Sequence, residues 1–228
     1  MDDLKILRLT GLAGVAGALL MFSGDMFLYG GFYGGAEFRE ISRRIMSEIP
    51  LLRLMIGGAI GPVAAMLYTI GFWHVYLALK EGGKKIAKIV FSGFVSMIII
   101  GGAYHSGFVN IGLVLRAKNS VNETDLKIIK TLFIQVLDYL HLLYNISFVF
   151  GLVGTILFLY LILFKKTKYP KWIILLTPTL LLLTSHIATY LPAPVGGIIY
   201  GGYINLSFLL FFCVSIIILW NGGSKTKF

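Results

Sequence analysis

The feature that most constrains the fold of this chain is a series of uninterrupted apolar runs. Residues 89–115 and 139–164 contain no Asp, Glu, Lys or Arg. A helix needs about 20 such residues to cross the hydrocarbon layer of a bilayer. Inside lipid, only helices and closed barrels satisfy every backbone N–H and C=O group. The runs are continuous and do not alternate with polar residues, so they predict membrane-spanning helices and not strands.

The composition supports the same class. Hydrophobic residues make up 57% of the 228 residues, and charged residues make up 13%. A soluble domain has about 45–50% apolar and about 25% charged residues. The chain therefore lacks the polar side chains that would cover a water-facing surface. We expect an all-α integral membrane protein with a single transmembrane domain over residues 1–228.

Span lengths predict a six-span transmembrane helical bundle. The expected spans lie at about residues 8–30, 52–79, 88–114, 130–164, 171–191 and 197–221. The first exceeds the length of a signal-peptide apolar region, so we interpret it as a retained span. Pro62 predicts a kink in the second, and the fourth is too long for a straight crossing. Apolar spacing in AEFREISRRIMSEIP predicts a short helix between spans one and two, either interfacial or packed on the bundle.

The distribution of positive charge predicts the orientation. With the N-terminus inside, inner segments hold twelve Lys and Arg residues and outer segments hold eight. This bias and the even span count place both termini in the cytoplasm, and the Lys- and Ile-rich composition suggests a bacterial inner membrane. Orientation explains the net charge of +10 better than nucleic-acid binding does, because no basic block stands apart from the spans.

Polar residues inside these spans are the candidates for function. Within VLDYLHLLYNISF, residues 136–148, Asp138, His141 and Asn145 share one helical face. In the predicted topology they lie at a similar depth to three groups on other spans, Asp25, His105 and His186. Burying such groups in hydrocarbon is expensive unless they are paired or reach water, so we expect a shared polar cavity in the outer leaflet. His74, near the inner face, is interpreted as a packing residue.

Three chemistries fit such a cavity, alongside plain helix packing. His105, His141 and His186 could ligate a divalent metal such as zinc, with Asp25 or Asp138 as a carboxylate ligand. Alternatively, the same five residues could act in metal-free acid–base catalysis, with Asp138 orienting His141. A proton or ion pathway is the third possibility. Candidate substrate-binding residues are Asn110, Asn145, Asn205, Tyr200 and Tyr203.

The proposed donor set is similar in chemistry to that of membrane hydrolases of the ceramidase and adiponectin-receptor superfamily. Those proteins use three histidines with an Asp and a Ser, and look like seven-span proteins with an HxxxH motif on a late helix. This chain has no HxxxH and six expected spans, so the similarity transfers no residue.

The leading expectation is a membrane-embedded, hydrolase-like enzyme acting on a lipid or another apolar small molecule, with or without a metal. Two alternatives remain open. One is a small-solute or proton-coupled transporter, and the other is a non-catalytic ligand-binding or immunity-type membrane protein. Membrane lipids are expected partners in each case.

Overall fold

The computed structural model describes residues 3–222, with only the backbone described at residues 123 and 124. This part of the chain is helical and contains no strand. The elements in chain order are α1 (Asp3–Tyr29), α2 (Gly35–Glu48), α3 (Leu51–Leu79), α4 (Lys84–Lys118), α5 (Glu123–Phe164), the 3₁₀ helix η1 (Lys171–Leu176), α6 (Pro178–Leu182), the 3₁₀ helix η2 (Ser185–Tyr190), α7 (Val195–Gly201) and α8 (Tyr203–Leu219).

Four helices, α1, α3, α4 and α5, are long and apolar enough to cross a membrane. A fifth span results if α7 and α8, which are bent by 78° relative to each other, are counted together. The structure therefore supports an all-helical membrane protein with four or five spans, and the predicted count of six is not confirmed.

The prediction of one continuous helix over 171–191 is wrong. Three short helical pieces, η1, α6 and η2, replace it. Pro178 has no N–H to donate, and Thr177 before it is extended, as the residue before a proline usually is. The segment still runs the length of the bundle. The Lys168 N–H donates to Ala78 O at one end of α3, and the Gly35 N–H donates to Leu191 O at the start of α2.

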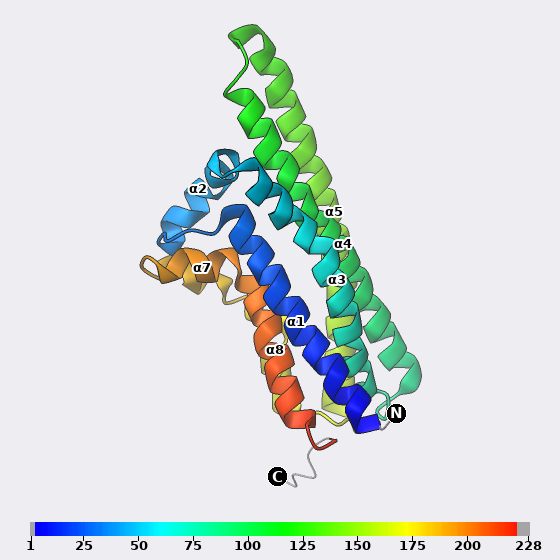
Figure 1. Ribbon diagram of the computed structural model, residues 1–228. Helices are drawn as coiled ribbons and strands as arrows, with labels where there is room; N and C mark the ends of the chain where they lie inside the picture. Colours follow the sequence, from blue (N-terminus) through cyan, green and yellow to red (C-terminus); the bar gives the residue numbers. More distant parts are fainter. Residues whose placement is uncertain (1–2, 223–228) are drawn as a thin grey trace.

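The bundle has two distinct ends, which are visible in Figure 1. At one end, here called the terminal end, α1 begins and α8 finishes. The Arg8 Nε donates to Trp220 O, and its guanidinium lies over the Trp220 ring. At the opposite end, here called the α2 end, α2 and α7 lie across the helices and the α4–α5 hairpin projects beyond them. As predicted, α5 exceeds a straight crossing, since its 42 residues measure about 63 Å at 1.5 Å per residue.

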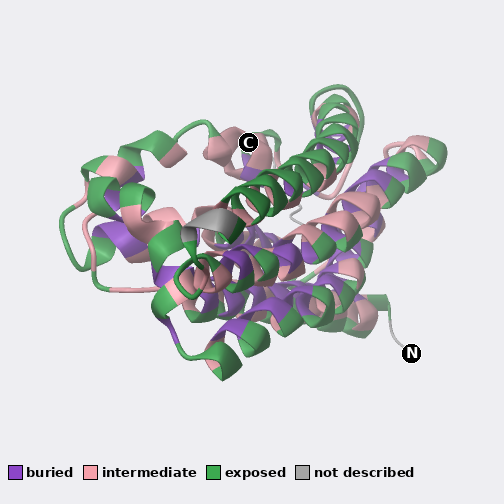
Figure 2. Ribbon diagram, turned by 90° about the horizontal axis from the view of Figure 1, so that it is seen from above, coloured by how far each residue is buried: buried purple, intermediate pink, exposed green. Residues whose placement is uncertain are grey.

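Glycine pairs bring the four long helices into close contact. A Cβ on Gly71 of α3 would overlap the backbone of Gly14 of α1. A Cβ on Gly61 of α3 would lie 2.7 Å from Gly102 O of α4, and one on Gly93 of α4 would lie 3.3 Å from Gly154 N of α5. Small residues at such crossings let helix backbones approach in lipid, where association depends on packing and not on hydrophobic expulsion from water. Figure 2 shows buried residues on the inner sides of the helices and exposed residues on the outer sides.

The helix predicted between the first two spans is present as α2. Its apolar residues Phe38, Ile45 and Met46 are buried, and its charged residues are exposed. The Phe38 ring packs edge-on against Tyr29 of α1 and Tyr200 of α7. The helix therefore packs on the bundle through its apolar face, and its predicted interfacial position stays a prediction.

The glycine crossing of α1 and α3 gives a stability prediction. We expect Gly71→Ala to destabilise the protein by about 1–3 kcal/mol, because the new methyl group forces two backbones apart. Thermal unfolding in detergent measures the effect. Gly101→Ala is the matched control, since a Cβ there would meet only Ser147 Oγ at 3.7 Å. Equal melting temperatures for the two variants would contradict the role of the crossing.

Candidate functional site

A buried polar cluster centres on Asp25 of α1, which is 3% exposed. Its Oδ1 accepts a hydrogen bond from the Tyr29 hydroxyl at 2.6 Å, and its Oδ2 accepts one from Asn205 Nδ2 of α8 at 2.7 Å. His105 Nδ1 of α4 lies 3.4 Å from Oδ1. The Tyr68 hydroxyl of α3 donates to Asn205 Oδ1 at 3.1 Å. Four helices, α1, α3, α4 and α8, therefore contribute to one polar site.

The second ring nitrogen of His105 defines its tautomer. Nε2 lies 3.0 Å from Gly57 O, and a carbonyl oxygen can only accept, so Nε2 carries a hydrogen. A hydrogen bond between Nδ1 and Asp25 then needs one further proton, held either on Nδ1 or on the carboxyl group. The printed contact at 3.4 Å thus places two groups that can each carry a proton side by side, a buried carboxyl and an imidazole. A group of this kind can donate a proton to a bound molecule or accept one from it.

Pro62 explains why Ser106, next to His105 on α4, forms a hydrogen bond with the backbone of α3. Because proline has no N–H, the carbonyl of Gly58, one turn earlier, lacks its usual helical donor. The Ser106 hydroxyl supplies a donor at 2.7 Å, while the adjacent Gly57 carbonyl faces His105. At Pro62, where a kink was predicted, α3 continues as a helix, and the effect of the proline is the free carbonyl of Gly58.

Two glycines leave space for the imidazole of His105. A Cβ on Gly24 of α1 would lie 2.8 Å from His105 Nε2, and a Cβ on Gly61 of α3 would lie 3.0 Å from Cδ2. The ring is 5% exposed and fills the junction between α1, α3 and α4. Any larger residue at either glycine position would displace it.

A cavity of about 340 Å³, here called the site cavity, adjoins this cluster. Asp25, His105 and Asn205 form part of its wall, and most of the remaining lining is apolar or aromatic, from α1, α4, α5, α6 and α8. Three of the α5 lining residues, Tyr144, Phe148 and Leu152, are between 39% and 44% exposed. Side chains that both line a cavity and reach the outside mark its mouth. The site cavity therefore opens through the side of the bundle.

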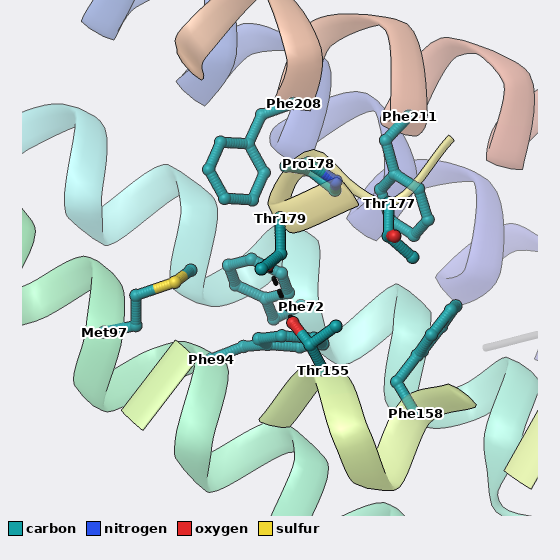
Figure 3. Close-up of a pocket in the computed structure, with 10 residues that line it drawn as sticks. All are labelled: Phe72, Phe94, Met97, Thr155, Phe158, Thr177, Pro178, Thr179, Phe208 and Phe211. Atoms are coloured by element: carbon teal, nitrogen blue, oxygen red, sulfur yellow. Dashed lines mark hydrogen bonds between the residues drawn. The ribbon is translucent and has the colours of Figure 1, made fainter. Parts of the chain in front are cut away.

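Toward the terminal end the site cavity is followed by a much smaller space, whose lining residues are drawn in Figure 3. A residual space of about 10 Å³ shares Met97 and Phe208 with it and holds no more than about one water molecule. The Thr155 hydroxyl of α5 pairs with the Thr179 hydroxyl of α6 at 2.8 Å across this space. The space is surrounded by five phenylalanines, here called the aromatic plug, namely Phe72, Phe94, Phe158, Phe208 and Phe211.

The structure brings together three of the residues predicted from sequence, Asp25, His105 and Asn205. Asp25 and His105 lie at a common depth, since each is 17 residues, or about 26 Å, from a cation near the terminal end, Arg8 in α1 and Lys88 in α4. The two side chains lie close together, and their predicted position in the outer leaflet stays a prediction.

The prediction that Asp138, His141 and Asn145 face the bundle interior is wrong. All three are classed as exposed on α5. Counting about 30 Å of hydrocarbon from Lys165 at 1.5 Å per residue reaches residue 145. If the hydrocarbon layer begins at Lys165, Asp138 and His141 fall beyond its other edge, where water can solvate them. Helix length, and not a shared catalytic cavity, accounts for their presence in this run.

The other predicted residues also lie away from the Asp25 cluster. His186 is exposed on η2 beside Tyr190, and Asn110 is exposed on α4. The Tyr203 hydroxyl pairs with the Thr184 hydroxyl at 2.6 Å, and Tyr200 packs on Phe38.

The donor set does not fit a zinc ion. In the described part of the chain, no group of three or more His, Cys, Asp or Glu side chains lies close enough to hold a metal ion. His105 directs one ring nitrogen at Gly57 O and the other at Asp25, while His141 and His186 are elsewhere. Zinc in catalytic sites commonly takes three protein ligands.

His74 agrees with its interpretation as a packing residue. Its Nδ1 lies 2.7 Å from Leu7 O, and its Nε2 lies 2.8 Å from Ser215 Oγ. Tyr169 adds a hydroxyl at 2.6 Å from the same Ser215 oxygen. The buried His74 thus ties α3 to α1 and α8 near the terminal end.

Sequence inspection missed two tyrosines of the site, Tyr29 and Tyr68. The position of Tyr29, four residues after Asp25, is a usable signal, because residues at i and i+4 are neighbours on a helix. Tyr68 offers no such local signal, since it reaches Asn205 from a helix 137 residues away in sequence.

The chain belongs to a protein family described as "Family of unknown function (DUF6796)", which it matches over residues 1–221. Comparison with curated proteins and with solved structures gives no match. The family assignment covers nearly the whole bundle, including the Asp25 cluster and the site cavity, and brings no activity with it.

The pairing of Ser106 with Pro62 gives a testable double-mutant prediction. Ser106→Ala removes the donor to Gly58 O and should cost about 1 kcal/mol of stability. In a Pro62→Ala background the new N–H at position 62 can serve Gly58 O, so the same serine substitution should cost much less. Thermal unfolding of the four proteins in detergent measures the coupling. An unchanged serine effect in the alanine background would refute this account.

Proposed function

We propose that this membrane protein binds an apolar molecule carrying one polar group, taken up from the bilayer into the site cavity. The observation that carries the proposal is the buried Asp25–His105 pair in the wall of a largely apolar cavity of about 340 Å³. Ligand sites typically have about 300–1,000 Å³, mostly apolar walls and a few polar groups that fix orientation. The pair can hydrogen-bond the polar group, while the aromatic wall contacts the remainder.

The mouth of the cavity supports a lipid-derived or lipid-soluble ligand. It lies beside Tyr144, Phe148 and Leu152 on the outer side of α5, a helix of membrane-spanning composition. A molecule dissolved in the bilayer can enter there without crossing a water layer. Membrane lipids are therefore the proposed partners and the proposed source of the ligand.

The aromatic plug disfavours the transporter alternative. A transported solute would need a path from the site cavity to the terminal end, and five phenylalanines around a space of about 10 Å³ occupy that direction. We propose binding without a permeation path through the bundle.

The hydrolase-like enzyme expected from sequence stays a second proposal, supported by the buried Asp25 carboxyl and the His105 imidazole, whose Oδ1 and Nδ1 atoms lie 3.4 Å apart. A serine nucleophile is not supported. The Ser147 hydroxyl, in the cavity wall, donates to Met97 O at 2.9 Å, and the Ser106 hydroxyl donates to Gly58 O. Chemistry at this site would therefore consist of proton transfer to or from the bound molecule or a water.

We further propose the inner membrane of a bacterium as the location, with both termini in the cytoplasm. The twelve-to-eight distribution of Lys and Arg supports this orientation. The adjacency of Arg8 and Trp220 supports termini on the same side.

Filling the site cavity tests the binding proposal. The probe is a long-chain alcohol carrying a photoreactive diazirine, added to the protein in lipid nanodiscs, with labelled peptides identified by mass spectrometry. We expect saturable labelling of the cavity wall that Gly101→Leu reduces at least about tenfold, since a side chain there points into open space. Ala103→Leu, on the exposed side of the same helix, is the matched control and should retain labelling. Labelling that does not saturate, or that both variants retain, would reject the proposal.

Asp25→Asn separates binding from catalysis. The amide keeps the shape of the side chain but cannot share a proton with His105. For a binding protein, we expect the variant to label more weakly and the extracted probe to stay chemically intact with both proteins. For an enzyme, the wild-type protein would convert the probe or an endogenous lipid, and the variant would not. Mass spectrometry of extracted lipids distinguishes the outcomes, and conversion by the wild type alone would replace the binding proposal with the enzyme.

A further inference from the structure

A second cavity, of about 370 Å³, lies at the α2 end and is here called the α2-end cavity. Residues of α1, α2, α4, α5 and α7 line it, so it lies beneath the two helices that cross this end of the bundle. Its polar lining includes Ser42 and Arg43 of α2 and His141 of α5. His141 does not contact the Asp25 cluster and instead lines the α2-end cavity.

Two arginines of α2, Arg39 and Arg43, differ from the neighbouring arginines in making no hydrogen bond or ion pair among the described residues, and of these two only Arg43 lines the cavity. Arg44 pairs with Glu48, Arg53 donates to three carbonyl oxygens at the end of α1, and Arg116 donates to Ile49 O. Arg43 makes no hydrogen bond and no ion pair among the described residues. The lining of the α2-end cavity includes no Asp or Glu. A guanidinium without an internal carboxylate is suited to bind an external anion, and its planar fork matches phosphate oxygens.

The two cavities are neighbours. Tyr29, Tyr104 and Phe108 line both of them, so the two cavities adjoin along these side chains. The Phe108 ring packs edge-on against Tyr104 at 4.9 Å and against Tyr29 at 6.0 Å between centroids. The arrangement is amphipathic, with a basic compartment at the α2 end and a largely apolar compartment within the bundle.

We propose that the α2-end cavity binds a phosphate-type anion, supplied by the headgroup of an anionic phospholipid whose acyl chain occupies the site cavity. Arg43 is the principal contact, Ser42 donates a further hydrogen bond, and His141 forms the opposite wall. The assignment deepens the proposed function and rests on it for the acyl chain. Arg43 and His141 line the α2-end cavity and do not line the site cavity.

The test compares phosphatidylglycerol with phosphatidylcholine, each titrated into the full-length protein in detergent and counted by native mass spectrometry. We expect preferential binding of phosphatidylglycerol, weakened about tenfold by Arg43→Gln, since a charge-assisted contact is lost. Arg39→Gln, an exposed position on α2 outside the cavity lining, is the matched control and should have no effect. His141→Gln should weaken binding less than Arg43→Gln. Equal affinities for the two lipids, or equal effects of the two arginine variants, would overturn the proposal.

Two additional arms separate the source of the anion and the dependence on the site cavity. Inorganic phosphate and glycerol phosphate are added as competitors. If either displaces the lipid at millimolar concentration in an Arg43-dependent manner, the ligand is a free phosphate compound and the lipid assignment is wrong. If Gly101→Leu leaves Arg43-dependent lipid binding intact, the chain does not occupy the site cavity. The proposed function then fails while the anion site stands.

Discussion

The contact on which the site depends is the close crossing of α3 and α4 at Gly61 and Gly102. With no side chains between the helices, backbone carbonyls of α3 come within reach of α4. Pro62 leaves Gly58 O without its helical donor, and Ser106 satisfies it, while Gly57 O orients His105. An unpaired carbonyl in hydrocarbon is expensive, so this docking fixes the register of the two helices. The imidazole is thereby held facing Asp25.

The cavities give the bundle an asymmetric interior. At the terminal end, the aromatic plug and the His74 contacts close the space between the helices. Toward the α2 end, the bent α7–α8 pair and the broken segment that contains α6 leave room for the site cavity. Short helical pieces in place of a continuous span expose part of α5 beside Tyr144 and Phe148. The region that departs most from the predicted six-span bundle is thus the region that forms the proposed binding site.

Sequence inspection succeeded where the signal was local. The apolar run predicted the start of α3 to within one residue. Apolar spacing predicted the presence of α2. The predicted span ends placed Asp25 and His105 at a similar depth. It failed for Asp138 and His141, because α5 extends about 30 Å past what a straight crossing needs and carries these residues into water. It also failed for 171–191, where apolar length suggested a helix that Pro178 interrupts.

The sequence by itself determined the class of the protein, since a chain with so few charged residues belongs in lipid, and continuous apolar runs satisfy their backbone there as helices and not as the alternating strands of a barrel. It also determined which residues are expensive to bury. Only the tertiary structure decided which of these residues meet. Periodicity defines one helix at a time, whereas the partners of Asp25 come from helices 80 and 180 residues further along the chain. Their meeting depends on glycine crossings whose pairing no local pattern encodes.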